Sequence, residues 1–169
     1  MKNLFFAAVA FLMVGAFASC TKTQTTVTEP NTAMVTLKLE VNNDMTNDTT
    51  YNGANQTQYE TVPAGTTVQF VVDTRNLQLN PVSGKNYEMK TYSATVAAGG
   101  VVTMELPAIG DPVNYTVKFA DIELMEKTNF YNTLTSRTES QEESVIYTLA
   151  DQTVTVFEGA ELKREFIYN

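Results

Sequence analysis

Alternation of apolar and polar residues is the feature of this sequence that most restricts its fold. In residues 34–41 (MVTLKLEV), valine and leucine occupy every second position, and Thr, Lys and Glu lie between them. Side chains of a β-strand point alternately to opposite faces of a sheet, so this spacing predicts a strand with one buried face. Similar strand patterns recur at 66–73, 87–97, 102–106, 113–119, 144–149, 153–157 and 161–168.

Residues rich in Pro, Gly and Asn separate these strands, which is typical of an all-β protein. We expect one antiparallel β-sandwich of about seven or eight strands over residues 33–169. Gly99-Gly100 is predicted to form a hairpin turn, and Glu158-Gly159 to lead into the last strand. Residues 121–135 are ambiguous: we favour a strand to about 126, with a short helix as the alternative, and then a polar loop through Glu143.

The first residues have the three parts of a secretory signal peptide. Lys2 gives a basic start, residues 4–17 form an apolar block without a charge, and Ala18 and Ser19 are small. A membrane-spanning helix needs about 20 apolar residues, and this block is shorter. We therefore expect residues 1–19 to be a signal peptide.

Cys20, the only cysteine of the chain, directly follows Phe17-Ala18-Ser19. This stretch resembles the lipobox of bacterial lipoproteins, in which small residues precede a cysteine that is lipidated and becomes the mature N-terminus. Leu is usual where Phe17 stands, although lipoboxes of Bacteroidetes are looser. The resemblance implies lipid attachment at Cys20, and several acyl chains give stable anchoring. The alternative is an ordinary signal peptide followed by a chance free thiol, which is unfavourable in an oxidising compartment.

Residues 20–32 are expected to form a flexible tether. The stretch 21–32 (TKTQTTVTEPNT) contains six threonines, one proline and a single sizeable apolar residue, Val27. A segment of this composition cannot bury enough apolar surface to fold. It is suited to hold a folded domain away from a membrane.

Two stretches resemble transthyretin-like sandwich domains, such as carboxypeptidase regulatory-like modules of bacterial surface proteins. They are PAGTTVQF at 63–70 and KTYSATVAAGGVVTMELPA at 90–108, followed by a Tyr-Thr-Val strand at 115–117. The resemblance covers roughly residues 33–120 and implies a small Bacteroidetes lipoprotein with a sandwich that can serve many functions. Where the family commonly has an acidic turn, this chain has Ala97-Ala98-Gly99-Gly100.

The residues give little support to catalysis. The chain has no histidine, which removes the usual general base, the Ser-His-Asp arrangement and most transition-metal sites. The single thiol is assigned to lipid, and no glycine-rich loop precedes a helix. A net charge of −8 disfavours binding to nucleic acid. We therefore expect neither an enzyme nor a bound cofactor.

Residues 42–57 (NNDMTNDTTYNGANQT) allow two further interpretations. Asp44, Asn47, Asp48 and Asn52 offer oxygen ligands for calcium, but their spacing is not that of an EF-hand and no Glu closes the loop. An ordinary long turn uses the same residue types, so we expect no metal site. Asp48-Thr49-Thr50 resembles the sequon for protein O-glycosylation in Bacteroidetes, which makes Thr49 a candidate acceptor.

Carbohydrate binding would have to depend on tyrosine, because the chain has no tryptophan. Tyr87, Tyr92, Tyr115, Tyr147 and Tyr168 lie in strand patterns and are expected in the core or in cross-strand pairs. The remaining three, in or near polar segments, are the candidates for ligand contact: Tyr51, Tyr59 and Tyr131.

These features predict a lipid-anchored, non-catalytic binding or accessory module of the bacterial cell envelope, with an unknown glycan or protein partner. The alternative is a structural subunit or anchor of a fimbria-like assembly, because fimbrillins of Bacteroidetes are lipoproteins built from such sandwiches that exchange strands. An unpartnered edge strand would favour assembly, and a sandwich completed by its own last strand would oppose it. We expect an outer membrane lipoprotein; periplasmic face and cell surface both stay open, and Lys22 near the cysteine favours the periplasmic face.

Overall fold

Strand β1 (Thr32–Val41) lies at the centre of one sheet and buries the face that its alternation predicts. In this computed structural model, which describes residues 31–169, β12 (Glu161–Tyr168) pairs with one side of β1. On the other side, β7 (Val101–Pro107) pairs with the first part of β1 and the short β4 (Glu60–Thr61) with its end. The predicted signal peptide, Cys20 and nearly all of the tether lie outside the described residues.

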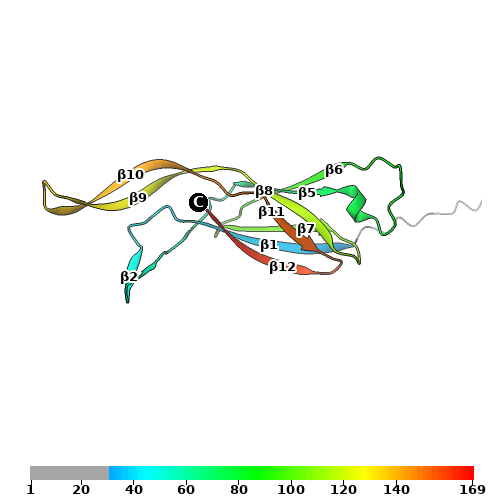
Figure 1. The fold of residues 1–169 in the computed structure, drawn as a ribbon, viewed down its shortest axis with the longest axis horizontal. Coiled ribbons are helices and arrows are strands. Elements are labelled where there is room, and N and C mark those ends of the chain that lie inside the picture. Colours follow the sequence, from blue (N-terminus) through cyan, green and yellow to red (C-terminus); the bar gives the residue numbers. More distant parts are fainter. Residues whose placement is uncertain (1–30) are drawn as a thin grey trace, which may run out of the picture.

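The second sheet has the order β11-β8-β5-β6, with every neighbouring pair antiparallel. Its strands are β11 (Gln152–Val156), β8 (Val113–Phe119), β5 (Thr67–Asp73) and β6 (Met89–Thr95). The two sheets pack face to face, as Figure 1 shows. The predicted all-β sandwich is therefore confirmed.

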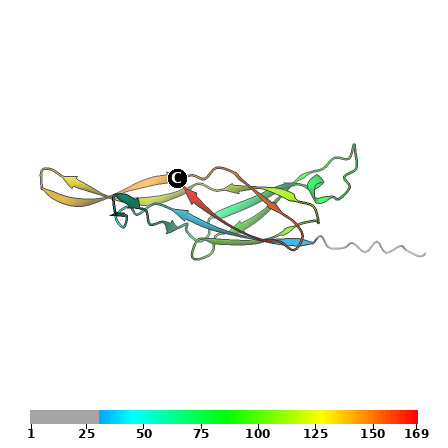
Figure 2. The same cartoon turned by 60° about the horizontal axis from the view of Figure 1, so that its bottom comes forward.

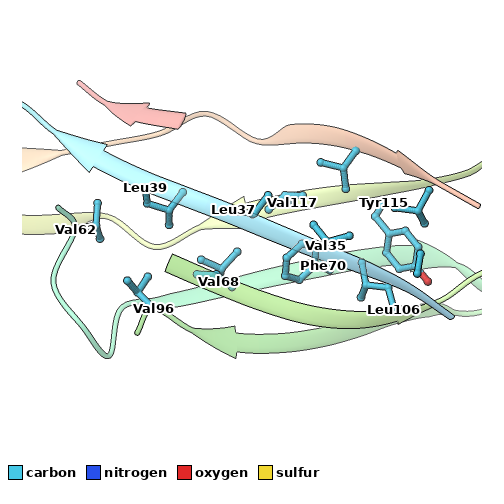
Figure 3. Packing of buried hydrophobic residues seen from close by; sticks show 14 of the residues in the cluster. Val35, Leu37, Leu39, Val62, Val68, Phe70, Val96, Leu106, Tyr115 and Val117 are labelled. Carbon is cyan, nitrogen blue, oxygen red and sulfur yellow. The ribbon is translucent and has the colours of Figure 1, made fainter. Parts of the chain in front are cut away.

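The core lies between these sheets and takes side chains from both. Val35, Leu37 and Leu39 of β1 are fully buried and point toward the second sheet, as Figure 3 shows. Phe70 of β5 and Tyr115 of β8 meet them from the opposite side, and both are fully buried. At about 25 cal/mol per Å² of apolar surface removed from water, this burial is the main contribution to the stability of the fold.

The last strand corrects one part of the prediction. β12 runs parallel to β1, in continuous register from Met34 opposite Glu161 to Val41 opposite Tyr168. The sandwich is thus not wholly antiparallel. Alternation shows which face of a strand is buried but carries no information on strand direction, and these two partners are separated by nearly the whole domain.

The turn at Gly99-Gly100 is present, but it does not join a hairpin. β6 pairs with β5 and β7 pairs with β1, so the turn carries the chain from one sheet to the other. The only ladder contact across it is an isolated bridge between Ala97 and Val101. The predicted strand at 87–97 also begins later, at Met89, so that Tyr87 lies in a loop.

The largest correction concerns residues 121–143. The predicted polar loop and the alternative short helix are both wrong, because β9 (Ile122–Asn132) and β10 (Arg137–Tyr147) form a long antiparallel hairpin. We call this hairpin, residues 122–147, the arm. Figures 1 and 2 show that it projects from one end of the sandwich, whereas the start of β1 lies at the opposite end.

Two smaller elements complete the described chain. β2 (Thr49–Tyr51) and β3 (Ala54–Gln56) form a short hairpin within the predicted loop 42–57. A 3-10 helix, η1 (Thr74–Leu77), follows β5. No helix within residues 31–169 has the length and apolar character needed to cross a membrane.

Candidate functional site

The arm changes character along its length. At its base, Ile122 and Tyr147 are buried in the core, and the next pair on the same face, Leu124 and Val145, packs against it. Beyond this pair most side chains are exposed on both faces of the ribbon. A two-stranded hairpin is only marginally stable by itself in water, so the outer arm depends on local interactions and on its anchored base.

The tip of the arm has such interactions. The side-chain oxygen of Asn132 accepts hydrogen bonds from the backbone N–H groups of Leu134 (3.0 Å) and Thr135 (3.3 Å). The Asn132 amide and the Thr135 hydroxyl donate to the carboxylate of Glu139 at 3.1 and 2.7 Å. These hydrogen bonds, from Asn132 first and then Thr135, lower the pKa of Glu139. The turn is therefore specified by its own side chains, with Ser136 in the left-handed region at φ 55°.

The base of the arm is also fixed from outside the hairpin. Lys127 N–H donates to the carbonyl of Asn43 (2.8 Å), and Met45 N–H donates to the carbonyl of Lys127 (2.7 Å). Segment 43–45 thus covers the outer edge of β9 where the arm leaves the sandwich. In addition, the Tyr147 hydroxyl donates to Glu126 at 3.0 Å. Burial, together with the Glu126 carboxylate, raises the pKa of Tyr147 to about 12.

The outer edge of β10 is different. Within the part of the chain that the structure describes, β9 is the only strand paired with β10. The register of the two strands is continuous from Arg137 to Tyr147, without a bulge, and β10 contains neither proline nor lysine. A long and regular free edge of this kind offers backbone N–H and C=O groups to another strand.

The charge of the arm is acidic. Residues 122–147 contain five acidic residues, Glu123, Glu126, Glu139, Glu142 and Glu143, and only two basic ones, Lys127 and Arg137. The one ion pair within the arm joins Lys127 to Glu142 at 3.8 Å. The free edge is therefore suited to a partner strand with basic side chains, and a second copy of the same edge would bring acid against acid.

The loop that precedes β4 is held together by carboxylates. Glu60 accepts hydrogen bonds from the backbone N–H groups of Asn43 (3.1 Å) and Asp44 (3.2 Å) and from the Asn47 amide (2.8 Å). Asp48 accepts from the backbone N–H of Gln58 at 2.8 Å. In this loop the carboxylates thus bind the chain's own donors, and residues 31–169 contain no cluster of three metal-ligating side chains of His, Cys, Asp or Glu.

Thr49 lies in β2 and is exposed, as an acceptor for glycosylation must be. It lines a polar pocket of about 380 Å³ between the β2–β3 hairpin and the arm, together with Asn42, Thr128 and Asn129. The structure therefore brings the predicted glycosylation loop next to β9. Asn52-Gly53, with φ of 49° and 74°, forms the tight turn of this hairpin, and an Asn-Gly pair is the signal that predicts such a turn.

The three tyrosines proposed for ligand contact are all on the surface. Tyr51 is 70% exposed in β2, Tyr59 is 44% exposed just before β4, and Tyr131 is 62% exposed near the arm tip. None of them lines the pocket at Thr49, so that pocket does not provide a shared site for the three rings. Tyr115, Tyr147 and Tyr168 are buried as expected, Tyr92 is half-buried, and Tyr87 is the exception described above.

Residues of the outer arm are the part of the site that the sequence prediction missed. The available signals were the β-propensity of Phe130-Tyr131 and the turn residues between Asn132 and Ser136. Comparisons with models of protein families, with curated proteins and with solved structures gave no match to this chain.

Proposed function

We propose that this chain is a lipid-anchored, non-catalytic binding module of the bacterial cell envelope, attached to the outer membrane through Cys20. The observation that carries the proposal is the position of the arm. β1 starts at one end of the sandwich, and the arm projects from the opposite end, as both views show (Figures 1 and 2). A domain held through residues preceding Thr32 therefore presents the arm away from its anchor.

The arm is proposed to contact a protein partner. Most of its side chains beyond Leu124 and Val145 are exposed, so the outer arm adds little to the core. Its free β10 edge and its excess of acidic side chains fit an extended, basic segment that adds as a strand. A glycan partner would use Tyr51, Tyr59 or Tyr131, none of which lines the pocket at Thr49, and is less well supported.

The alternative of a fimbria-like subunit has weaker support. Eight residues of β12 pair with β1, so the chain's own last strand occupies that side of the sheet. Assembly by strand exchange would leave this place free for a donor from another subunit. The free edge of β10 allows contact with other chains, but its acidic side chains oppose pairing with the same edge of a second copy.

A photocrosslinking experiment in intact cells tests the proposal. A photoreactive amino acid replaces Gln141, which is exposed on β10, and in a matched variant it replaces Lys163, which is exposed on β12 of the sandwich. We expect a discrete protein adduct from position 141 that is absent from position 163. Reversal of charge by Glu142→Lys and Glu143→Lys should abolish the adduct.

The opposite result is equally clear. No adduct from position 141, or the same adduct from both positions, would contradict binding by the arm. An adduct that persists after reversal of both charges would contradict a basic partner segment while leaving the arm as the contact surface.

A further inference from the structure

A second surface lies at the other end of the sandwich, in residues 74–90, which we call the tether-end loop. The loop is ordered by its own contacts. Thr74 N–H donates to the carbonyl of Glu88 (2.9 Å), and Glu88 N–H donates back to the Thr74 hydroxyl (3.0 Å). Farther out, the backbone N–H of Val82 donates to the Tyr87 hydroxyl at 2.8 Å. The side chains of the loop are therefore held on a defined framework.

Several apolar side chains of this loop are not covered by the protein. Leu79, Val82 and Met89 are 63%, 64% and 64% exposed. Leu79 and the half-buried Leu77 also line an open cleft of about 690 Å³ between the loop and residues 107–110. Exposed apolar side chains gathered on one loop, beside an open cleft, are typical of a surface that contacts a membrane or another protein.

The charge of the loop differs from that of the rest of the chain. Residues 74–90 contain three basic residues, Arg75, Lys85 and Lys90, and one acidic residue, Glu88, although the chain as a whole has a net charge of −8. All three basic side chains are exposed. Two acidic neighbours lie outside the loop: Asp73, which accepts a hydrogen bond from the backbone N–H of Arg75, and Glu158, which lines the cleft. The loop itself thus combines basic and apolar side chains on an acidic protein.

The position of this surface in the molecule indicates which partner it contacts. Asn31, the first described residue, lines the same cleft as Leu77 and Leu79. Only residues 21–30 lie between Cys20 and this point, and the eleven steps from Cys20 to Asn31 span at most about 40 Å when fully extended. If Cys20 carries the lipid, Asn31 cannot be farther than that from the bilayer, and the cleft and the loop lie beside Asn31 at this end of the sandwich.

We infer that the tether-end loop docks onto the surface of a lipid bilayer with anionic headgroups. Leu79, Val82 and Met89 enter the interface between headgroups and acyl chains, and Lys85 and Lys90 contact lipid phosphates. Each basic side chain near an anionic surface contributes attraction that falls off within a Debye length. Docking at this end of the sandwich leaves the arm, which projects from the opposite end, pointing away from the bilayer.

Vesicle flotation of the unlipidated chain tests this inference. The chain starts at Thr21 and lacks Cys20; every buried core residue lies within 33–168, so the whole core is retained. We expect binding to vesicles of phosphatidylethanolamine and phosphatidylglycerol. The triple variant Leu79→Ser, Val82→Ser, Met89→Ser should bind at least about tenfold more weakly, and Lys85→Glu about tenfold more weakly.

A matched control variant loses the same number of exposed apolar side chains, but from the arm. Met125, Leu134 and Ile146 of the arm are also exposed, and their replacement by serine should leave vesicle binding unchanged. Equal thermal unfolding midpoints of all variants show that the fold is intact. Absence of wild-type binding, or an equal loss in the arm variant, would overturn the inference. Because the tested chain carries no lipid, this failure is distinct from a failure of anchoring at Cys20.

Discussion

The hydroxyl of Tyr147 donates a 3.0 Å hydrogen bond to the carboxylate of Glu126 on the paired strand of the arm. Tyr147 is 5% exposed and belongs to the core, whereas Glu126 is half-buried just beyond it. This contact therefore links the sandwich to the first part of the arm that lies outside the core.

Removal of the Tyr147 hydroxyl by Tyr147→Phe should lower the free energy of unfolding by about 1 kcal/mol, because a partly buried hydrogen bond to a charged group is lost. Urea denaturation measures the change. Tyr131→Phe is the control: that ring is 62% exposed, and its change should stay within about 0.5 kcal/mol. Equal effects of the two variants would show that the contact at Tyr147 contributes nothing.

Stability should fall at alkaline pH because of buried tyrosines. Burial, and then Asp121, raises the pKa of Tyr168 to about 12, and burial with the Glu126 carboxylate does the same for Tyr147. Burial, with a smaller contribution from Tyr92, also raises the pKa of Tyr115. In the unfolded chain tyrosine ionises near pH 10, so the unfolded state loses protons first. Stability is therefore complete below about pH 10 and declines as pH rises toward about 12.

Urea unfolding measured across this alkaline range tests the prediction. The Tyr168→Phe variant should show a shallower decline, since one of the three titrating groups is gone, although it also loses the 3.1 Å hydrogen bond to the Ala120 carbonyl. A free energy of unfolding that stays constant or rises with pH would contradict buried, neutral tyrosines.

Two neighbouring glycines separate the effect of backbone conformation from that of close packing. Gly99 and Gly100 both have positive φ, 83° and 73°, but a Cβ at Gly99 would have open space, whereas one at Gly100 would collide with the carbonyl oxygen of Leu39. Gly99→Ala should cost about 1–2 kcal/mol, the usual penalty for a left-handed residue. Gly100→Ala should cost about 3 kcal/mol or more, because the packing of the turn against β1 must also shift. Similar losses in both variants would argue against the close approach to β1.

The arm tip should loosen when Glu139 is removed. Hydrogen bonds from Asn132 and Thr135 lower the pKa of Glu139 from its ordinary value of 4.5. Glu139 therefore stabilises the tip fully at pH values above 4.5, and this stabilisation is lost as the pH falls through the lowered pKa. Glu139→Ala should increase amide exchange in residues 130–139 at neutral pH and leave the core strands protected. Glu142→Ala, outside the tip, should not change exchange there. Unchanged exchange in Glu139→Ala would contradict the tip network.

Strands with one buried face could be predicted from sequence because each alternates clearly. β1, β5, β8 and β11 lie close to their predicted ranges, and their inward side chains, such as Leu37 and Val117, are fully buried. The arm could not be found in this way. Both faces of its outer part are exposed, so no alternation distinguishes residues 127–143 from a polar loop.

The pairing between distant strands also could not be predicted from the sequence. The parallel contact of β12 with β1 depends on how the chain crosses between sheets, as does the path of the turn at Gly99-Gly100, and neither leaves a local pattern. The exposed positions of Tyr51, Tyr59 and Tyr131 agree with their polar surroundings, and none of the three lines the pocket at Thr49.

The proposed orientation of the domain depends on lipid attachment at Cys20, and metabolic labelling with an alkyne-bearing fatty acid tests that attachment most directly. The wild-type chain should carry the label and fractionate with membranes, and Ser19→Ala, which keeps a small residue before the cysteine, should behave in the same way. Cys20→Ser should be unlabelled. Wild-type protein without label, or label that persists in Cys20→Ser, would contradict the proposed anchor.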